Sequence, residues 1–298
     1  MMTAEFSCVR GRFAPSPSGP LHFGSLVAAL GSYLHAKSQG GQWLVRIEDI
    51  DAPRTVPGAD SEILRTLEQF GLYWDERVVW QSQRLDLYQD YFEQFRQQLY
   101  GCQCNRARIA ALGGIYDGHC SGLGLAADAG PLAWRLKSAG VNTEFTDLFR
   151  GPQQIPTALA GEDYIIKRRD GLFAYQWVVV IDDIEQSISE VIRGADLLQM
   201  TPRQQALCRT FGAPVPVYGH LPLAVTAPGH KLSKQNHATD IRCFAPAHSL
   251  TAALRFLGQQ LPVDAELLPV TELLQFALQH WQAAAVPGQP EIQINSFT

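Results

Sequence analysis

Hydrophobic positions in the first third of the chain follow two alternating patterns. Residues 8–13 have strand character, and from Phe23 onward apolar side chains recur at helical spacing. Residues 43–47 predict a buried strand, and helical spacing returns over residues 63–70 and 88–99. Strands that alternate with helices predict an α/β fold.

The pattern changes in the middle of the chain, where residues 101–160 interrupt the alternation. Strand-like segments resume afterwards at residues 164–166, 173–175 and 177–181, and we expect residues 188–193 to pair with them. Two short helices are predicted near the end, at residues 250–257 and 270–281. The predicted divisions are the first half of an α/β domain, an insertion, the second half of that domain and a helical region, at residues 1–100, 101–160, 161–240 and 241–298.

Composition narrows the class of protein. With 298 residues and 46% hydrophobic content, the chain can bury a substantial core. A net charge of −5 argues against a general nucleic-acid coat, so any RNA-binding surface must be local. No leader or membrane-spanning segment is evident, and we expect a soluble cytoplasmic protein. No coiled-coil pattern is evident either, which favours a monomer.

A Pro/Ser/Gly run at residues 15–20 separates the first strand from the first helix, and His22 and Gly24 follow it. The first amides of a helix lack intrahelical partners, so this junction can cradle phosphate, with a hydrogen bond from His22. Gly24 allows a close approach of the ligand. The alternative is an ordinary turn that His22 caps.

A second candidate phosphate site is the sequence KLSK at residues 231–234. Lys231 and Lys234 could stabilise charge on a phosphoryl group and its leaving pyrophosphate, although a solvated basic loop is the alternative. Taken together, the two strings predict an enzyme that activates a carboxylate with ATP. The chain contains neither a Walker P-loop nor a GxGxxG sequence, so such an enzyme would not be a P-loop protein.

Three of the six cysteines, Cys102, Cys104 and Cys120, fall within a short Gly-rich stretch. In a cytosolic chain this spacing favours a structural zinc site over disulfides, and the alternative is three reduced thiols without metal. A fourth ligand is needed, and Tyr116 and His119 lie in the same loop. From chemistry alone His119 is preferred, because imidazole is a common zinc ligand.

Several motifs together resemble one enzyme family. RFAPSPSG at residues 12–19, HFGS at 22–25, RIEDID at 46–51, IRGADLL at 192–198 and KLSK at 231–234 are similar to the glutamyl branch of class I aminoacyl-tRNA synthetases. The resemblance implies a Rossmann-type parallel sheet with a zinc-containing insertion and a short C-terminal helical region. Only about sixty residues follow KLSKQ, so we expect no large anticodon-binding domain.

That truncation and the C-x-C, Tyr, x3-C spacing resemble the glutamyl-Q tRNA(Asp) synthetase family. The resemblance implies Tyr116 as the fourth zinc ligand, in place of His119. It also implies activation of L-glutamate by ATP without tRNA, followed by transfer of the glutamyl group to the cyclopentene-diol of queuosine in tRNA(Asp). Magnesium is expected with ATP, but the sequence shows no dedicated site, and Asp182 and Asp183 are interpreted as turn residues.

The resemblance also assigns residues to substrates. The glutamate pocket would be lined by Arg12, Phe13, Ala14, Pro15, Ser16, Glu48, Tyr175 and Arg193. ATP would be bound by His22, Gly24, Ser25, Lys231 and Lys234, with His22 and Lys234 as the catalytic residues.

The charges of the predicted pocket agree with a substrate that has two carboxylates and one ammonium. Arg12 and Arg193 supply two cations and Glu48 one anion. We place Glu48 on the ammonium and Arg193 on the side-chain carboxylate; the alternative is that Arg12 or Arg193 forms an ordinary ion pair. Two other functions compete with the leading one: a truncated synthetase that charges a tRNA 3′ end, and an idle paralogue that binds nucleotide or RNA.

Overall fold

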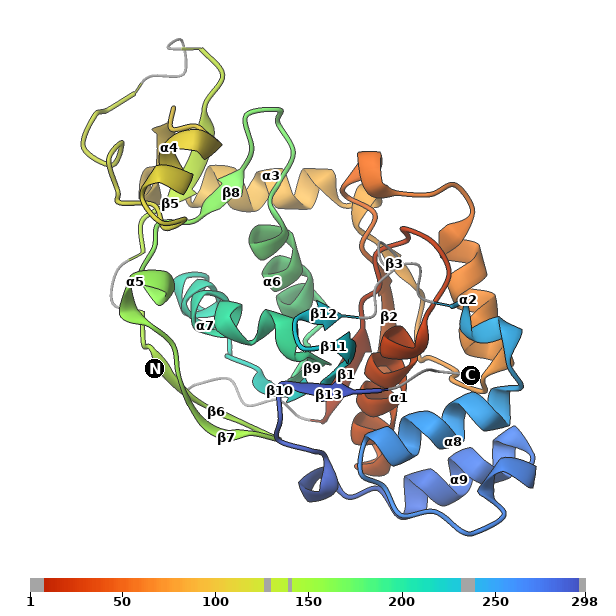
Figure 1. Ribbon diagram of the computed structural model, residues 1–298. Helices are drawn as coiled ribbons and strands as arrows, with labels where there is room; N and C mark the ends of the chain where they lie inside the picture. The colour runs from red at the N-terminus through yellow and green to blue at the C-terminus, as the bar shows by residue number, and fades with distance from the viewer. Residues whose placement is uncertain (1–7, 126–129, 139–140, 232–238, 295–298) are drawn as a thin grey trace.

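Parallel strands form the centre of the computed structural model, which describes residues 8–125, 130–138, 141–231 and 239–294 (Figure 1). These strands are β1 (Arg10–Phe13), β2 (Gln42–Ile47), β3 (Val79–Trp80), β9 (Glu190–Gly194) and β10 (Val217–Leu221). β2 pairs in parallel with both β1 and β3, and β9 pairs in parallel with β10. The Ser189 amide donates to the Arg10 carbonyl at 3.0 Å, so β9 lies beside β1 and the order is β3–β2–β1–β9–β10.

This order reverses between β1 and β9. The chain leaves β1 through α1 (Phe23–Ser38) toward β2 on one side, while β9 and β10 extend the sheet on the other. In open α/β sheets the crevice outside the carboxyl ends of the strands at such a reversal is where ligands bind. The predicted strands at residues 8–13 and 43–47 and the helix from Phe23 are confirmed.

Successive side chains of β1 and β2 point to opposite faces, and each face has its own helices. Phe13 and Trp43 belong to the larger apolar core, shared with α1, α2 (Ala59–Gln69), α8 (Pro246–Phe256) and α9 (Val270–Gln279). Arg12 and Arg46 instead reach α6 (Tyr175–Glu185). A second core joins α6 to α3 (Leu85–Gln94) and α7 (Thr201–Thr210).

The prediction of strands at residues 173–175 and 177–181 was wrong, because Tyr175 begins helix α6. Residues 177–181 are all at most 1% exposed, and a helix buried on every side has no polar stripe to reveal its period. Residues 188–193 do supply β9, but it pairs with β10 and not with the expected strands. The predicted helix at residues 88–99 ends early, at Gln94.

The interrupting region forms antiparallel structure around a short helix. β4 (Leu99–Cys102), β5 (Ala133–Leu136) and β8 (Ile165–Lys167) make one sheet, near α4 (Arg106–Ala111). A hairpin of β6 (Glu144–Asp147) and β7 (Gly151–Gln154) follows, then α5 (Thr157–Ala160). The Leu148 amide donates to the Tyr218 carbonyl at 2.9 Å, so the hairpin docks on β10.

The two predicted helices near the end of the chain are confirmed as α8 and α9, which lie on the opposite side of the molecule from α4 (Figure 1). A small sheet joins β11 (Leu223–Ala227) to β12 (His230–Lys231) and β13 (Glu291–Gln293). Across the described residues, no helix has both the length and the apolar character needed to cross a membrane.

Candidate active site

The loop between β1 and α1 ends at His22, which is the N-cap of α1. Its Nδ1 accepts a hydrogen bond from the Ser25 amide at 3.3 Å. Gly19 in this loop has φ +134, a conformation that side chains with a Cβ rarely adopt. His22 therefore caps the helix as the alternative predicted, and the cap uses Nδ1 of the imidazole and not Nε2.

A cavity of about 360 Å³ lies between this loop and the segment after β9. From the loop it is lined by Phe13, Pro15, Ser16, His22, Gly24 and Ser25, and across from them by Gly194, Asp196 and residues 221–224. The cavity therefore occupies the crevice between β1 and β9. A Cβ on Gly194 would lie 2.7 Å from Asp196 Oδ1 and 3.0 Å from Leu223, so a larger residue here would displace these two side chains of the cavity wall.

A second cavity, of about 170 Å³, is lined by Glu48, Tyr175, Asp51 and Arg168, among others. Ser16 lines both cavities, so ligands bound in the two would meet beside it. The half-buried Ala14 is two residues away. Lys231 ends the described backbone of β12, and Lys234 lies outside the described residues.

Glu48 follows β2 directly, and its amide donates to the Pro15 carbonyl at 3.0 Å. Its side chain is 9% exposed and lies 3.5 Å from Nη2 of Arg46. Burial raises the pKa of Glu48 to about 7, and the charges of Arg46 and Arg12 oppose this shift. An added cation in the cavity would favour the ionised carboxylate.

The two arginines predicted for the glutamate pocket have different partners. Arg12 is 3% exposed and forms an ion pair with Asp183 at 3.0 Å, as in the ion-pair alternative. Arg193 is 6% exposed and donates only to neutral acceptors. Among the described residues, no carboxylate lies within 4.0 Å of its guanidinium. Arg193 is thus a buried cation that lacks an anion.

Tyr175, at the start of α6, links these groups. Burial raises its pKa, the Glu48 carboxylate adds to the shift, and the charges of Arg193 and Arg12 oppose it. Tyr175 is therefore close enough to all three for their charges to act on it. Glu48 and Tyr175 line the smaller cavity, and the charges of Arg12 and Arg193 reach Tyr175 from beside it.

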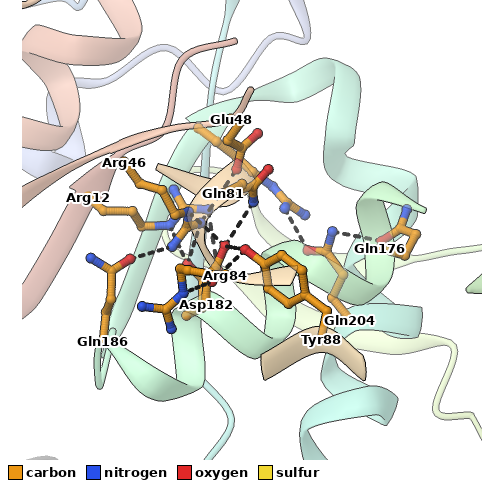
Figure 2. A network of polar contacts seen from close by, with 12 residues as sticks. Arg12, Arg46, Glu48, Gln81, Arg84, Tyr88, Gln176, Asp182, Gln186 and Gln204 are labelled. Carbon is orange, nitrogen blue, oxygen red and sulfur yellow. Dashed lines mark hydrogen bonds and ion pairs between the residues drawn. The ribbon is translucent and has the colours of Figure 1, made fainter. Parts of the chain in front are cut away.

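Asp182 and Asp183 were wrongly interpreted as turn residues. Both lie in α6 and are buried against the strands, and Figure 2 shows Asp182 there. Asp183 accepts from Arg12 and, at 2.8 Å, from Arg46, and these two guanidinium groups hold its pKa below the ordinary value although burial would raise it. In a helix, Asp182 and Asp183 lie one turn after Val178 and Val179 and therefore on the same buried side. A helix assignment for residues 177–181 would have indicated that the two aspartates are buried.

Asp182 is the centre of the polar cluster in Figure 2 and is fully buried. It accepts from the Tyr88 hydroxyl at 2.9 Å and from the Gln81 amide at 2.8 Å, and it pairs with Arg84 at 2.8 Å. Arg46 lies 3.7 Å away. One carboxylate therefore connects α6 to both β2 and α3.

The three clustered cysteines lie together at the β4 end of the insertion. The sulfur atoms of Cys102, Cys104 and Cys120 are within 4.8 Å of one another, a donor set that fits zinc. Tyr116 is 4% exposed and its hydroxyl accepts from the Cys120 amide at 2.7 Å. His119 is exposed and is not part of the cluster.

Comparisons with known proteins place the chain in a family. It matches the family described as "tRNA synthetases class I (E and Q), catalytic domain" over residues 8–115 and 124–260. A protein of Vibrio vulnificus (strain CMCP6) named glutamyl-Q tRNA(Asp) synthetase is 54% identical over 285 residues, which are 95% of this chain and 92% of the relative. A protein of the same name from Escherichia coli O6:H1 is 54% identical over 93% of this chain and 90% of the relative.

A solved structure supports the same fold. It is a glutamate tRNA ligase from Elizabethkingia meningosepticum in complex with its amino acid, 27% identical, with a TM-score of 0.78. The match covers 93% of this chain and 65% of that chain, so this chain spans less than two thirds of the ligase. These likenesses confirm the expected class I synthetase fold.

The Asp182 cluster predicts a large loss of stability when its central carboxylate is removed. We expect Asp182→Ala to lower the free energy of unfolding by about 3–5 kcal/mol, because Arg84 and the fully buried Arg46 each lose a charge partner and the buried Tyr88 and Gln81 side chains lose their acceptor. Urea denaturation measures this, with the exposed Asp86→Ala on neighbouring α3 as the matched control. Equal midpoints for the two variants would contradict the prediction.

Proposed function

The chain belongs to the class I tRNA synthetases of the glutamate and glutamine branch, within the glutamyl-Q tRNA(Asp) synthetase family, and we propose that it transfers ATP-activated L-glutamate to queuosine in tRNA(Asp). It is a synthetase-type ligase. The observation that carries the proposal is Arg193, a buried cation that has no carboxylate within 4.0 Å among the described residues and whose charge, like that of Glu48, acts on Tyr175.

This charge pattern suits glutamate better than a neutral amino acid. Arg12 is already paired with Asp183, so Arg193 is the arginine available for the side-chain carboxylate, and Glu48 is available for the ammonium. Tyr175 closes the pocket between them. This assignment retains Arg193 and Glu48 in their predicted roles. Arg12 has a supporting role, in which its positive charge acts on Glu48 and Tyr175.

The larger cavity is the proposed ATP site. The N-terminus of α1 supplies amides and a positive dipole end for the phosphates, and Gly24 and Ser25 lie in its first turn. Lys231 and Lys234 retain their predicted roles on the phosphates, and magnesium would accompany ATP as charge neutralisation. No enzymic nucleophile is required, so catalysis is positioning and electrostatics.

The proposed reaction has two steps at the junction beside Ser16. A carboxylate oxygen of glutamate attacks the α-phosphorus of ATP, the bond to the β-phosphate oxygen breaks, and pyrophosphate leaves. A hydroxyl of the acceptor then attacks the carbonyl carbon of the adenylate, loses its proton, and displaces AMP. The second step gives an ester whichever diol supplies the hydroxyl.

The cysteine cluster is proposed as one structural zinc site with Cys102, Cys104, Cys120 and Tyr116 as ligands. Zinc would supply folding energy to a loop with few apolar contacts of its own. The burial of Tyr116 and the exposure of His119 support the tyrosine. The cytoplasm and a monomeric state remain predictions.

Glu48 predicts a pH dependence for glutamate. Its pKa is raised to about 7, so the carboxyl is ionised above that pH and protonated below it. A protonated carboxyl offers no charge to the ammonium, and we therefore expect kcat/KM for glutamate to fall as the pH decreases below about 7. Glutamate-dependent ATP–pyrophosphate exchange at saturating ATP measures this, and Glu48→Gln should abolish the pH dependence along with most of the activity. A flat wild-type profile between about pH 6 and about pH 8 would contradict the role of Glu48.

Metal content tests the zinc site. We expect about one zinc per purified chain, lost in Cys120→Ser but retained in Cys208→Ser, whose thiol is buried away from the cluster. Tyr116→Phe should release zinc to a chelator faster than wild type, and His119→Ala at the wild-type rate. The reverse order for the last two variants would assign the fourth ligand to His119.

The acceptor is tested with three forms of one tRNA(Asp) and labelled glutamate. We expect acceptance by the queuosine-containing tRNA, by the same tRNA without its 3′-terminal nucleotide, and no acceptance by the queuosine-free transcript. Removal of the terminal nucleotide is preferable to periodate, because periodate cleaves the vicinal diols of both the terminal ribose and queuosine. If acceptance of glutamate depends on the 3′-terminal nucleotide, the protein is a truncated synthetase that charges the tRNA 3′ end. If the protein shows no glutamate-dependent ATP–pyrophosphate exchange, it is an idle paralogue.

A further inference from the structure

Two buried residues that the proposed mechanism does not use, His220 and Asp147, form a hydrogen-bonded line with Arg193. The Nε–H of Arg193 donates to Nε2 of His220 at 3.0 Å, and Nδ1 of His220 lies 2.5 Å from Oδ2 of Asp147. His220 is fully buried and Asp147 is 1% exposed. Neither residue was identified from the sequence.

The proton positions in this line are fixed by chemistry. A guanidinium has donors and no acceptor, so Nε2 of His220 must carry a lone pair. The proton of the neutral ring is then on Nδ1, which donates to Asp147. Burial lowers the pKa of His220 to about 4, although its hydrogen bond to Asp147 opposes the shift, so the ring is neutral at physiological pH.

Asp147 is itself held rigidly at the end of β6. Its Oδ1 accepts from the backbone amides of His220, Phe149 and Arg150 at 3.1–3.2 Å. One carboxylate oxygen thus fixes the turn of the β6–β7 hairpin on β10, and the other fixes the ring of His220. The orientation of the imidazole follows from the hairpin.

The other contacts of Arg193 are also to neutral acceptors. Nη1 donates to Gln204 at 2.6 Å, and Nη2 donates to the Leu197 carbonyl at 3.2 Å and to the Thr201 hydroxyl at 3.0 Å. With the bond to His220, the plane of the guanidinium is fixed. A carboxylate in direct contact with Arg193 would fix the guanidinium equally well, but it would compete with an anionic substrate. The imidazole of His220 stands between Arg193 and the Asp147 carboxylate and so prevents this competition.

We propose that Asp147 and His220 are positioning residues that hold Arg193 oriented and without a directly bound carboxylate, so that it selects the side-chain carboxylate of the substrate. The proposal rests on the proposed function for the identity of that substrate. The hydrogen-bonded line from Asp147 through His220 to Arg193 is independent of the proposed function.

Four variants test the line through glutamate-dependent ATP–pyrophosphate exchange. His220→Leu removes the acceptor for Arg193. Asp147→Asn keeps an oxygen for the backbone amides but places an NH2 group against Nδ1, so the ring must carry its proton on Nε2, against Arg193. His220→Gln keeps both a carbonyl oxygen and an NH2 donor. The matched control is His35→Gln, since the buried His35 also pairs with a carboxylate, that of the partly buried Glu190, at 2.9 Å.

For His220→Leu and Asp147→Asn we expect KM for glutamate to rise roughly ten- to a hundred-fold, the effect of a hydrogen bond to a charged group, with KM for ATP within about two-fold. His220→Gln should recover most of the affinity, and His35→Gln should leave both KM values unchanged. An unchanged KM for glutamate in His220→Leu, or equal rises in both KM values, would overturn the proposal.

A measurement without substrate separates this proposal from the proposed function. In ¹⁵N-histidine spectra of the free protein, we expect the His220 proton on Nδ1 in wild type and on Nε2 in Asp147→Asn, with His220→Gln assigning the signal. A wild-type proton on Nε2 overturns the line. If wild type shows no glutamate-dependent exchange, the proposed function fails, and these spectra alone decide whether the line holds Arg193.

Discussion

The interaction on which the site depends is the buried pairing of Asp183 on α6 with Arg12 of β1 and Arg46 of β2. Two neighbouring strands each direct an arginine to the same face of the sheet, and one carboxylate from the helix satisfies both. A buried pair of this kind adds little net stability compared with apolar packing, but removing one member is costly, so it fixes which helix lies on the face and in what register. Because Arg12 is already paired with Asp183, Arg193 is the buried arginine that we propose for an anionic ligand.

Helix α7 connects this pocket to the cysteine loop through two consecutive residues. Gln204 accepts from Arg193, while Arg203 pairs with Glu162 at 2.6 Å. Glu162 in turn accepts from the Tyr116 amide at 3.0 Å. The insertion is therefore held against the helix that orients Arg193, and the β6–β7 hairpin reaches the same arginine through His220. The inserted segment contributes structure to the pocket as well as a surface beside it.

The sequence predicted those parts of the molecule whose signals are local. The first strand, the capped helix from Phe23 and the strand before Glu48 follow from periodicity and turn residues, and the three cysteines follow from their spacing. Helix α6 was missed because residues 177–181 are buried on every side and show no period. The Asp147–His220 contact joins residues 73 positions apart, and no local pattern could indicate it. Placing Tyr116 in the zinc set and Arg193 in the glutamate pocket required the resemblance to a family.

The geometry of activation and the choice of acceptor are separate problems in this molecule. In the proposed reaction, glutamate and the α-phosphate meet at the carboxyl ends of β1, β2 and β9, and an acceptor needs only a hydroxyl that can reach the adenylate carbonyl. A terminal ribose and the cyclopentene of queuosine both present vicinal hydroxyls on a five-membered ring, so the reacting centre has little means of telling them apart. Discrimination must then come from contacts with the RNA around the diol, at surfaces remote from Arg193 and Glu48. For this reason the glutamate pocket can closely resemble that of a ligase that charges tRNA while the product differs, and the acceptor has to be established on the RNA and not from the pocket.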